Sequence, residues 1–162
     1  MLSMPIAKEC GCPDLDLSRW DGQVQKLDVH FYSTPILHLF YAPLGGDRKL
    51  AEAQAKAKAS GYHLHPVPMR LIRAARLFGG RCMVEIKEVG LGDPKVFRFA
   101  GAYPCTVHRG SRRELPALVR DMHARDPNLE SVYLWQVSCP RCAPNPASSV
   151  TILIAETLVG SE

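Results

Sequence analysis

The sequence contains one short segment twice, and this internal repeat restricts the possible folds more than any other feature. The first copy reads GGDRKL at residues 45–50 and the second reads GSRREL at residues 110–115. An apolar, β-type run precedes each copy and a helix-type run follows it. Because two copies are too few to stack as a solenoid, we expect two halves that share one core across a pseudo-twofold axis.

The same order of elements, strand–helix–strand–strand, is expected in both halves. Asp47 is expected to cap the first helix, while Ser111 and Glu114 fit a capping box for the second. Pro116 would then fall just past the first turn and loosen it. The predicted fold class is α+β: a tandem βαββ repeat with pseudo-twofold symmetry, in which helices pack on an antiparallel sheet. We expect a leader at residues 1–28 that lies over one domain at residues 29–158, with halves at about 29–90 and 95–158.

Composition excludes several classes of protein. A hydrophobic content of 46% and a charged content of 22% are those of a globular domain. The formal net charge is +4, and the basic residues are dispersed, so we expect no nucleic-acid partner. The sequence has no apolar run of membrane-spanning length and begins without a signal core, so we expect no membrane partner and a cytoplasmic location.

Four of the six cysteines form two close pairs. Cys10 and Cys12 are separated by one residue, and Cys139 and Cys142 by two. A CxxC pair is a good half-site for tetrahedral zinc, so one structural zinc ion could bind all four thiolates and fasten the leader to the domain. The alternatives are a dithiol redox pair, capture of a soft metal, and two pairs that never meet. We favour the structural metal.

The second copy of the repeat resembles the GyrI-like, or SOUL-like, effector-binding proteins. The resemblance depends on Gly101-x-Tyr103 and His108-x-Gly110 followed by a short helix, and the tandem layout over residues 29–158 matches that fold. Members of this superfamily bind apolar or cationic small molecules, or haem, in a cleft between the halves, and one subset hydrolyses cyclopropanoid toxins. The family pattern does not include the four cysteines.

The resemblance also implies which residues line the cleft. Tyr133 and Trp135 share one face of a predicted strand, and Glu156 lies near the end of a neighbouring apolar strand. In the family an acid flanked by aromatic residues recognises cations or activates water. An exposed strand end explains Glu156 equally well, and aromatic residues at strand spacing are often core. The candidate ligand-binding residues are Tyr41, Tyr103, Tyr133, Trp135 and Glu156.

Three functions compete on this basis. The first, which we favour, is a stand-alone protein that sequesters or senses a small apolar or cationic ligand. The second is a hydrolase with Glu156 as general base. The third is a metal- or thiol-handling protein that uses the cysteine pairs. The sequence favours a binding protein over an enzyme, and it does not indicate the ligand or the oligomeric state.

Overall fold

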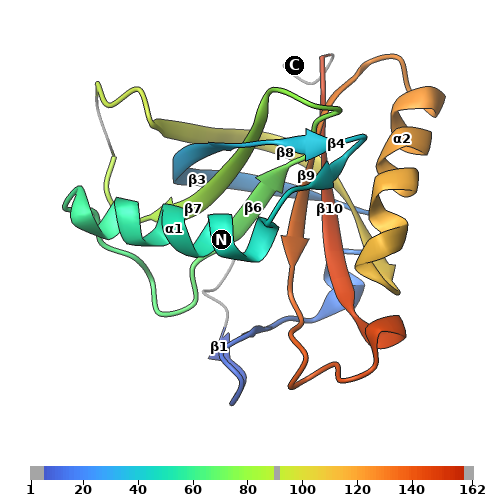
Figure 1. Cartoon of the computed structure of the whole chain (residues 1–162), viewed down its shortest axis with the longest axis horizontal. Coiled ribbons are helices and arrows are strands. Elements are labelled where there is room, and N and C mark those ends of the chain that lie inside the picture. Colours follow the sequence, from blue (N-terminus) through green and yellow to red (C-terminus); the bar gives the residue numbers. More distant parts are fainter. Residues whose placement is uncertain (1–5, 90–91, 159–162) are drawn as a thin grey trace.

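Six antiparallel strands form a sheet that closes into a barrel (Figure 1). The computed structural model describes residues 6–89 and 92–158. Around the barrel the strands follow the order β10-β8-β3-β7-β6-β9. Together with two helices they give the α+β class with an antiparallel sheet that the sequence predicts. The strands are β3 (Gln23–Ile36), β6 (Arg70–Arg73), β7 (Gly80–Ile86), β8 (Val96–Arg109), β9 (Leu129–Gln136) and β10 (Val150–Thr157).

Two short hairpins, three 3-10 turns and two α-helices lie outside the six strands of the barrel in the described residues. Two short hairpins pair β1 (Ile6–Ala7) with β2 (Pro13–Asp14) and β4 (His38–Leu39) with β5 (Ala42–Pro43). The 3-10 turns are η1 (Leu17–Arg19), η2 (Arg112–Glu114) and η3 (Pro146–Ser148). Neither of the described α-helices, α1 (Gly46–Ala59) and α2 (Leu115–Arg125), has the length and apolar character needed to cross a membrane.

The two helices cover different parts of the barrel's outer surface. Helix α1 buries Leu50 and Ala53 against Val84 and neighbouring residues of β3, β6 and β7. Helix α2 buries Leu115 and Val119 in a cluster with residues of β9 and β10. These small and branched side chains follow the helical spacing, so each helix presents one apolar stripe to the sheet.

The expected starts of both helices need correction. Asp47 makes no capping bond; Gly45 occupies the N-cap position of α1, in the left-handed conformation. Ser111 accepts a bond from the N–H of Arg113 and begins the 3-10 turn η2, so α2 itself starts only at Leu115. Pro116 therefore lies in the first turn of α2, where no intrahelical partner for its nitrogen is required.

The main core fills the inside of the barrel. Side chains alternate along each strand, so residues two apart share a face. On this basis Leu27 and Phe31 of β3, and Tyr133 and Trp135 of β9, all point inward, and all four belong to one buried cluster. The inward faces of the other strands complete it with Leu71, Met83, Phe99, Tyr103, Cys105, Ile152 and Ile154.

Strand β3 begins earlier than the sequence pattern indicates. The pattern places the first strand at about Val29, but β3 starts at Gln23 and pairs continuously with β8 from Gln23–Cys105 to Tyr32–Val96. The outward face of this segment is exposed to solvent and carries polar side chains, so the sequence pattern did not identify the segment as a strand. The first residues of β3 thus belong to the barrel, and the expected boundary between the halves at about residues 90–95 lies partly outside the described residues.

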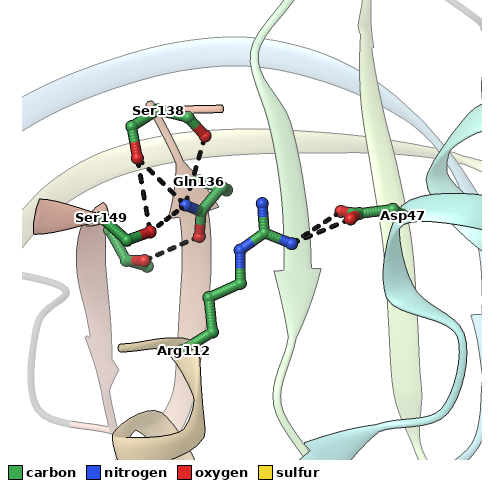
Figure 2. A network of polar contacts seen from close by, with 6 residues as sticks. Asp47, Arg112, Gln136, Ser138 and Ser149 are labelled. Carbon is green, nitrogen blue, oxygen red and sulfur yellow. Dashed lines mark hydrogen bonds and ion pairs between the residues drawn. The ribbon is translucent and has the colours of Figure 1, made fainter. Parts of the chain in front are cut away.

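An ion pair joins the two copies of the repeated segment. The carboxylate of Asp47 accepts hydrogen bonds from Nη1 of Arg112, at 3.0 and 2.9 Å (Figure 2). Asp47 and Arg112 occupy the same position in the two copies, the third residue of GGDRKL and of GSRREL. The twofold relation between the halves stays a prediction.

Candidate functional site

The four paired cysteines lie together at one end of the barrel. Cys10 and Cys12 come from the hairpin between β1 and β2, and Cys139 and Cys142 come from the loop between β9 and β10. All four Sγ atoms lie within 4.8 Å of one another. The thiols are free, and the Sγ atoms of Cys139 and Cys142 are 3.9 Å apart. The sequence-based expectation that the two pairs meet is therefore confirmed.

Both cysteine pairs sit on tight backbone turns. In the leader, Gly11 adopts a φ of 87°, and the N–H of Lys8 donates to the carbonyl of Cys12 at 2.8 Å. In the second loop, the N–H of Cys139 donates to Sγ of Cys142 at 3.3 Å. Hydrogen bonds from the backbone of Cys142 and Arg141 lower the pKa of the Cys139 thiol to about 6. Burial and contact with the other thiols raise the pKa of Cys12.

A polar network holds the base of the second cysteine loop. The side-chain amide of Gln136 donates to the hydroxyls of Ser149 at 2.8 Å and Ser138 at 3.3 Å (Figure 2). Its amide oxygen accepts from Thr151 at 2.9 Å. Ser138 also accepts from the N–H of Val150 at 2.8 Å. These bonds tie the end of β9 to the start of β10, so the loop carrying Cys139 starts from a fixed base.

The predicted acid lies on the inward face of the barrel beside two tyrosines. The hydroxyl of Tyr133 donates to the carboxylate of Glu156 at 3.2 Å. Burial raises the pKa values of Tyr133 and Tyr103, and the Glu156 carboxylate raises both further. Both phenols therefore stay protonated at neutral pH. Glu156 itself is half-buried, so this polar group marks a place where the lumen meets solvent.

Aromatic rings surround this acid. Phe99 stacks on Tyr103 with ring centroids 4.1 Å apart and meets Tyr133 edge to face at 4.8 Å. No hydrogen bond joins the Tyr103 hydroxyl to another described residue, so this hydroxyl can donate to a ligand. Tyr103, Tyr133 and Glu156 are thus brought together, as the resemblance implies.

The other two aromatic candidates lie elsewhere. Trp135 points inward, but Trp20 of the leader covers it edge to face at a centroid distance of 5.3 Å, and both indoles are buried. Tyr41 does not face the same groove, which corrects the sequence-based placement. Its backbone has a φ of 69° in the β4–β5 turn, and its ring stacks on His123 of α2 at 5.5 Å. The tight turn directs Tyr41 to the outer surface of the barrel.

Two hollows mark the surface. One, of about 470 Å³, is lined by inward-facing Val29 and Glu85 together with His65. Val29 also packs against the cluster that contains Tyr103 and Tyr133, so one wall of this hollow adjoins the buried core. The other, of about 610 Å³, is lined by Leu37, Phe78 and Arg81 among others. The predicted ligand-binding residues line neither hollow.

Sequence reasoning missed two polar residues that the strand register places near this acid. Ser131 is buried and is the direct register partner of Glu156 on β9. Nε of Arg73 donates to the hydroxyl of Ser131 at 2.9 Å. Arg73 and Ser131 lie on the same face as inward residues of their strands, so alternation could have placed them in the lumen. Alternation does not show which strands are neighbours, and that is what brings them to Glu156.

Comparison with known proteins identifies the family. The model of a family described as bacterial hydrolase matches residues 3–157. The chain belongs to this bacterial hydrolase family. No curated protein matches the chain.

Solved structures resemble this member of the bacterial hydrolase family at low sequence identity. The EcmrR chain of an EcmrR–DNA complex is 14% identical with a TM-score of 0.56, and the alignment covers 84% of this chain and 57% of that one. The chain thus spans little more than half the length of EcmrR, and the likeness concerns the fold. A hydrolase from Listeria innocua is 15% identical with a TM-score of 0.43, and 84% of this chain and 92% of that chain are covered.

Proposed function

We propose that this member of the bacterial hydrolase family hydrolyses a small, mainly apolar molecule with Glu156 as general base. The observation that carries the proposal is the half-buried carboxylate of Glu156, which accepts a hydrogen bond from Tyr133 on an inward face made mostly of apolar and aromatic side chains. Few polar groups in an apolar setting are typical of small-molecule sites. The family description favours the enzyme over the pure binding protein that the sequence alone favours.

Glu156, Tyr103 and Tyr133 have separate roles in the proposed reaction. The Glu156 carboxylate accepts a proton from a water molecule as the water oxygen forms a bond to the electrophilic carbon of the substrate. The Tyr103 hydroxyl donates a hydrogen bond to the oxygen on which negative charge develops. When the bond to the leaving group breaks, Glu156 returns the proton to that group. Tyr133 donates to Glu156 and fixes the orientation of its carboxylate.

A series of 4-nitrophenyl esters of increasing acyl length tests this proposal. Glu156→Gln keeps the shape of the side chain and removes the base, so we expect kcat to fall by ~10²-fold or more while binding is nearly intact. The control is Glu130→Gln, because Glu130 is exposed on the same strand as Tyr133. Equal turnover by Glu156→Gln and the wild type would refute the role of Glu156. Ligand binding without any turnover would favour the binding protein instead.

We also propose that the four cysteines bind one structural zinc ion. Zinc–sulfur bonds of ~2.3 Å in a tetrahedron place the sulfur atoms ~3.8 Å apart. The Cys139–Cys142 separation of 3.9 Å and the limit of 4.8 Å for the whole group fit this geometry with small adjustments. The ion would supply the positive charge that lets four neighbouring thiols lose their protons.

Metal analysis of purified protein tests the zinc site. We expect about one equivalent of zinc, lost in Cys142→Ser together with stability, because metal-binding free energy becomes folding free energy. The matched control is Cys82→Ser, because Cys82 is buried under α1, away from the four clustered cysteines. The Cys82→Ser protein should keep its zinc. Protein purified under reducing conditions without any metal would contradict the proposal.

We also propose that the fold is a pseudo-twofold tandem βαββ repeat of the GyrI-like type, because this fold explains why the segment at residues 45–50 recurs at residues 110–115. Two observations support it. Asp47 and Arg112 hold equivalent positions and bind each other, as residues beside a twofold axis do. The pairings β3–β8 and β6–β9 each join the equivalent strands of the two halves. Superposition of residues 29–89 on 95–158 in an experimental structure would test it.

A further inference from the structure

Two arginines lie directly opposite each other on adjacent strands of the barrel. Arg73 of β6 and Arg81 of β7 are register partners. Alternation from Leu71 and Met83, both members of the interior cluster, places the two arginines on the inward face. Both side chains are half-buried. Like charges directly opposite in a sheet are destabilising, so this pair requires a compensating partner.

In the described part of the chain, no acidic side chain neutralises either guanidinium. Arg73 donates to the hydroxyl of Ser131, and Arg81 lies over the ring of Phe97 at 5.5 Å from its centroid. Both of these partners are uncharged. Within residues 6–89 and 92–158, no carboxylate oxygen comes within the 4.0 Å of an ion pair with either arginine. A guanidinium has five N–H donors, so most of the ten remain free for a ligand.

A buried hydroxyl on the inward face of the neighbouring strand β3 also lacks a hydrogen-bond partner among the described residues. Ser33 is 1% exposed, and its Oγ makes no hydrogen bond. It follows Phe31 by two residues on β3, so it faces inward, and its register partner Met83 is two residues from Arg81. A buried polar group without a partner is costly. The unpaired hydroxyl thus lies on the same inward face as the two guanidinium groups, two residues along the sheet from Arg81.

The surface next to Arg81 has the same sign of charge. Arg81 lines the hollow of about 610 Å³ together with Arg48 and Lys49; these two pair with Glu52, and no acidic side chain is among the described residues that line the hollow. A depression lined by one sign of charge concentrates ligands of the opposite sign. This side of the barrel therefore attracts anions.

We propose that Arg73, Arg81 and Ser33 form a subsite for the carboxylate of an amphiphilic ligand, whose apolar body lies along Phe97 and Phe99. The subsite adjoins the candidate acid, because Arg73 binds Ser131 and Ser131 is the register partner of Glu156. This inference deepens the proposed function and rests on it only for the chemistry at Glu156. It replaces the cationic ligand of the sequence-based expectation with an anionic one.

Three probes of equal chain length test the subsite by binding alone: octanoate, 1-octanol and octylammonium. Binding is followed by calorimetry with Glu156→Gln protein, so that no turnover interferes. We expect octanoate to bind at least ~10-fold more tightly than octanol and octylammonium more weakly than either, with only octanoate weakened by salt. Arg81→Gln and Arg73→Gln should each reduce octanoate binding by ~10-fold and leave octanol binding unchanged. Arg98→Gln is the control, because Arg98 is exposed and already paired with Asp28.

Two further measurements separate the subsite from a structural role and from the hydrolase. Arg81→Gln removes a like-charge contact, so its unfolding midpoint should equal or exceed that of the wild type. In the active protein, Arg81→Gln should raise KM for mono-4-nitrophenyl adipate and not for 4-nitrophenyl hexanoate. Absence of turnover with selective octanoate binding would refute only the hydrolase. Equal binding of octanoate and octanol, or equal losses of both in the arginine variants, would overturn the subsite.

Discussion

Replacing Trp20 tests how the leader is held on the barrel. Trp20 follows the 3-10 turn η1 and is 4% exposed, with its ring edge against Trp135. Leu15 and Leu17 pack against the same cluster. A buried tryptophan covers 150–250 Å² of apolar surface, which is worth ~4–6 kcal/mol at 25 cal/mol per Å². Measured costs of Trp→Ala in cores are ~3–5 kcal/mol, and we expect a loss in this range for Trp20→Ala.

The same segment has a second attachment, which makes a double-mutant cycle informative. With the proposed zinc ion bound, Cys10 and Cys12 would fasten the leader at the cysteine cluster, whereas Trp20 fastens it by packing against Trp135. Once one attachment is lost, the segment is partly released and the second removal costs less. The cycle of Trp20→Ala with Cys12→Ser should therefore give a coupling free energy of ~1–3 kcal/mol.

Urea unfolding in the presence of one equivalent of zinc provides the assay. In the Trp20→Ala proteins, Trp135 is the only remaining tryptophan. Leu115→Ala combined with Cys12→Ser is the control cycle, because Leu115 packs under α2 in a separate cluster. We expect that pair to be additive within ~0.5 kcal/mol. A cost below ~1 kcal/mol for Trp20→Ala, or an additive Trp20–Cys12 cycle, would refute the idea that the leader is one docked unit.

Two further predictions concern the β4–β5 region. His38 is fully buried, and neither of its ring nitrogens has a hydrogen-bond partner among the described residues; burial lowers its pKa. Below pH ~6.5 the unfolded chain binds a proton that folded His38 does not, so the unfolding free energy should fall between pH 7.5 and 5, and less so in His38→Gln. Equal pH dependence in both proteins would contradict this. Gly80→Ala should lower the unfolding free energy by ~1–3 kcal/mol in urea, because a Cβ would lie 2.4 Å from His38 and 2.7 Å from the carbonyl of Ile36; an unchanged value would show that the contact relaxes.

Local pattern was sufficient for the helices and for most strands. The stripes in residues 46–59 and 115–125 and the alternation in 132–137 each depend on neighbours in sequence. Closure of the barrel depends on partners that no local pattern shows. Strand β6 meets β9 at only two register pairs, Ile72–Leu134 and Arg73–Tyr133, yet these complete the ring. The start of β3 was missed for the same reason: β8 is 14 residues long and provides a partner for a polar segment.

In the candidate site, too, some residues were predicted from the sequence and others are shown only by the strand register. Spacing alone favoured a site in which Cys10, Cys12, Cys139 and Cys142 meet, because close cysteine pairs are typical half-sites for a tetrahedral metal ion. Glu156 and Tyr133 were also predicted, from a resemblance in which both are expected. The arginine pair was not predicted, since an arginine on a half-buried strand usually indicates an exposed face. Only the register between β6 and β7 shows that Arg73 and Arg81 are opposed.

The distance between the two candidate sites decides what the metal can do. Val137 lies two residues before Cys139, and its N–H donates to the carbonyl of Val150, the first residue of β10. The cysteine loop therefore adjoins the start of β10. Glu156 lies six residues further along that strand, which at 3.3–3.4 Å per residue is about 20 Å. A zinc ion with four thiolate ligands has no open position for water or substrate. At that distance a metal in the cysteine cluster cannot activate a water for a substrate beside Glu156. In the proposed zinc site, such an ion would instead hold the leader, and with it Trp20, against the end of the barrel that lies away from Glu156.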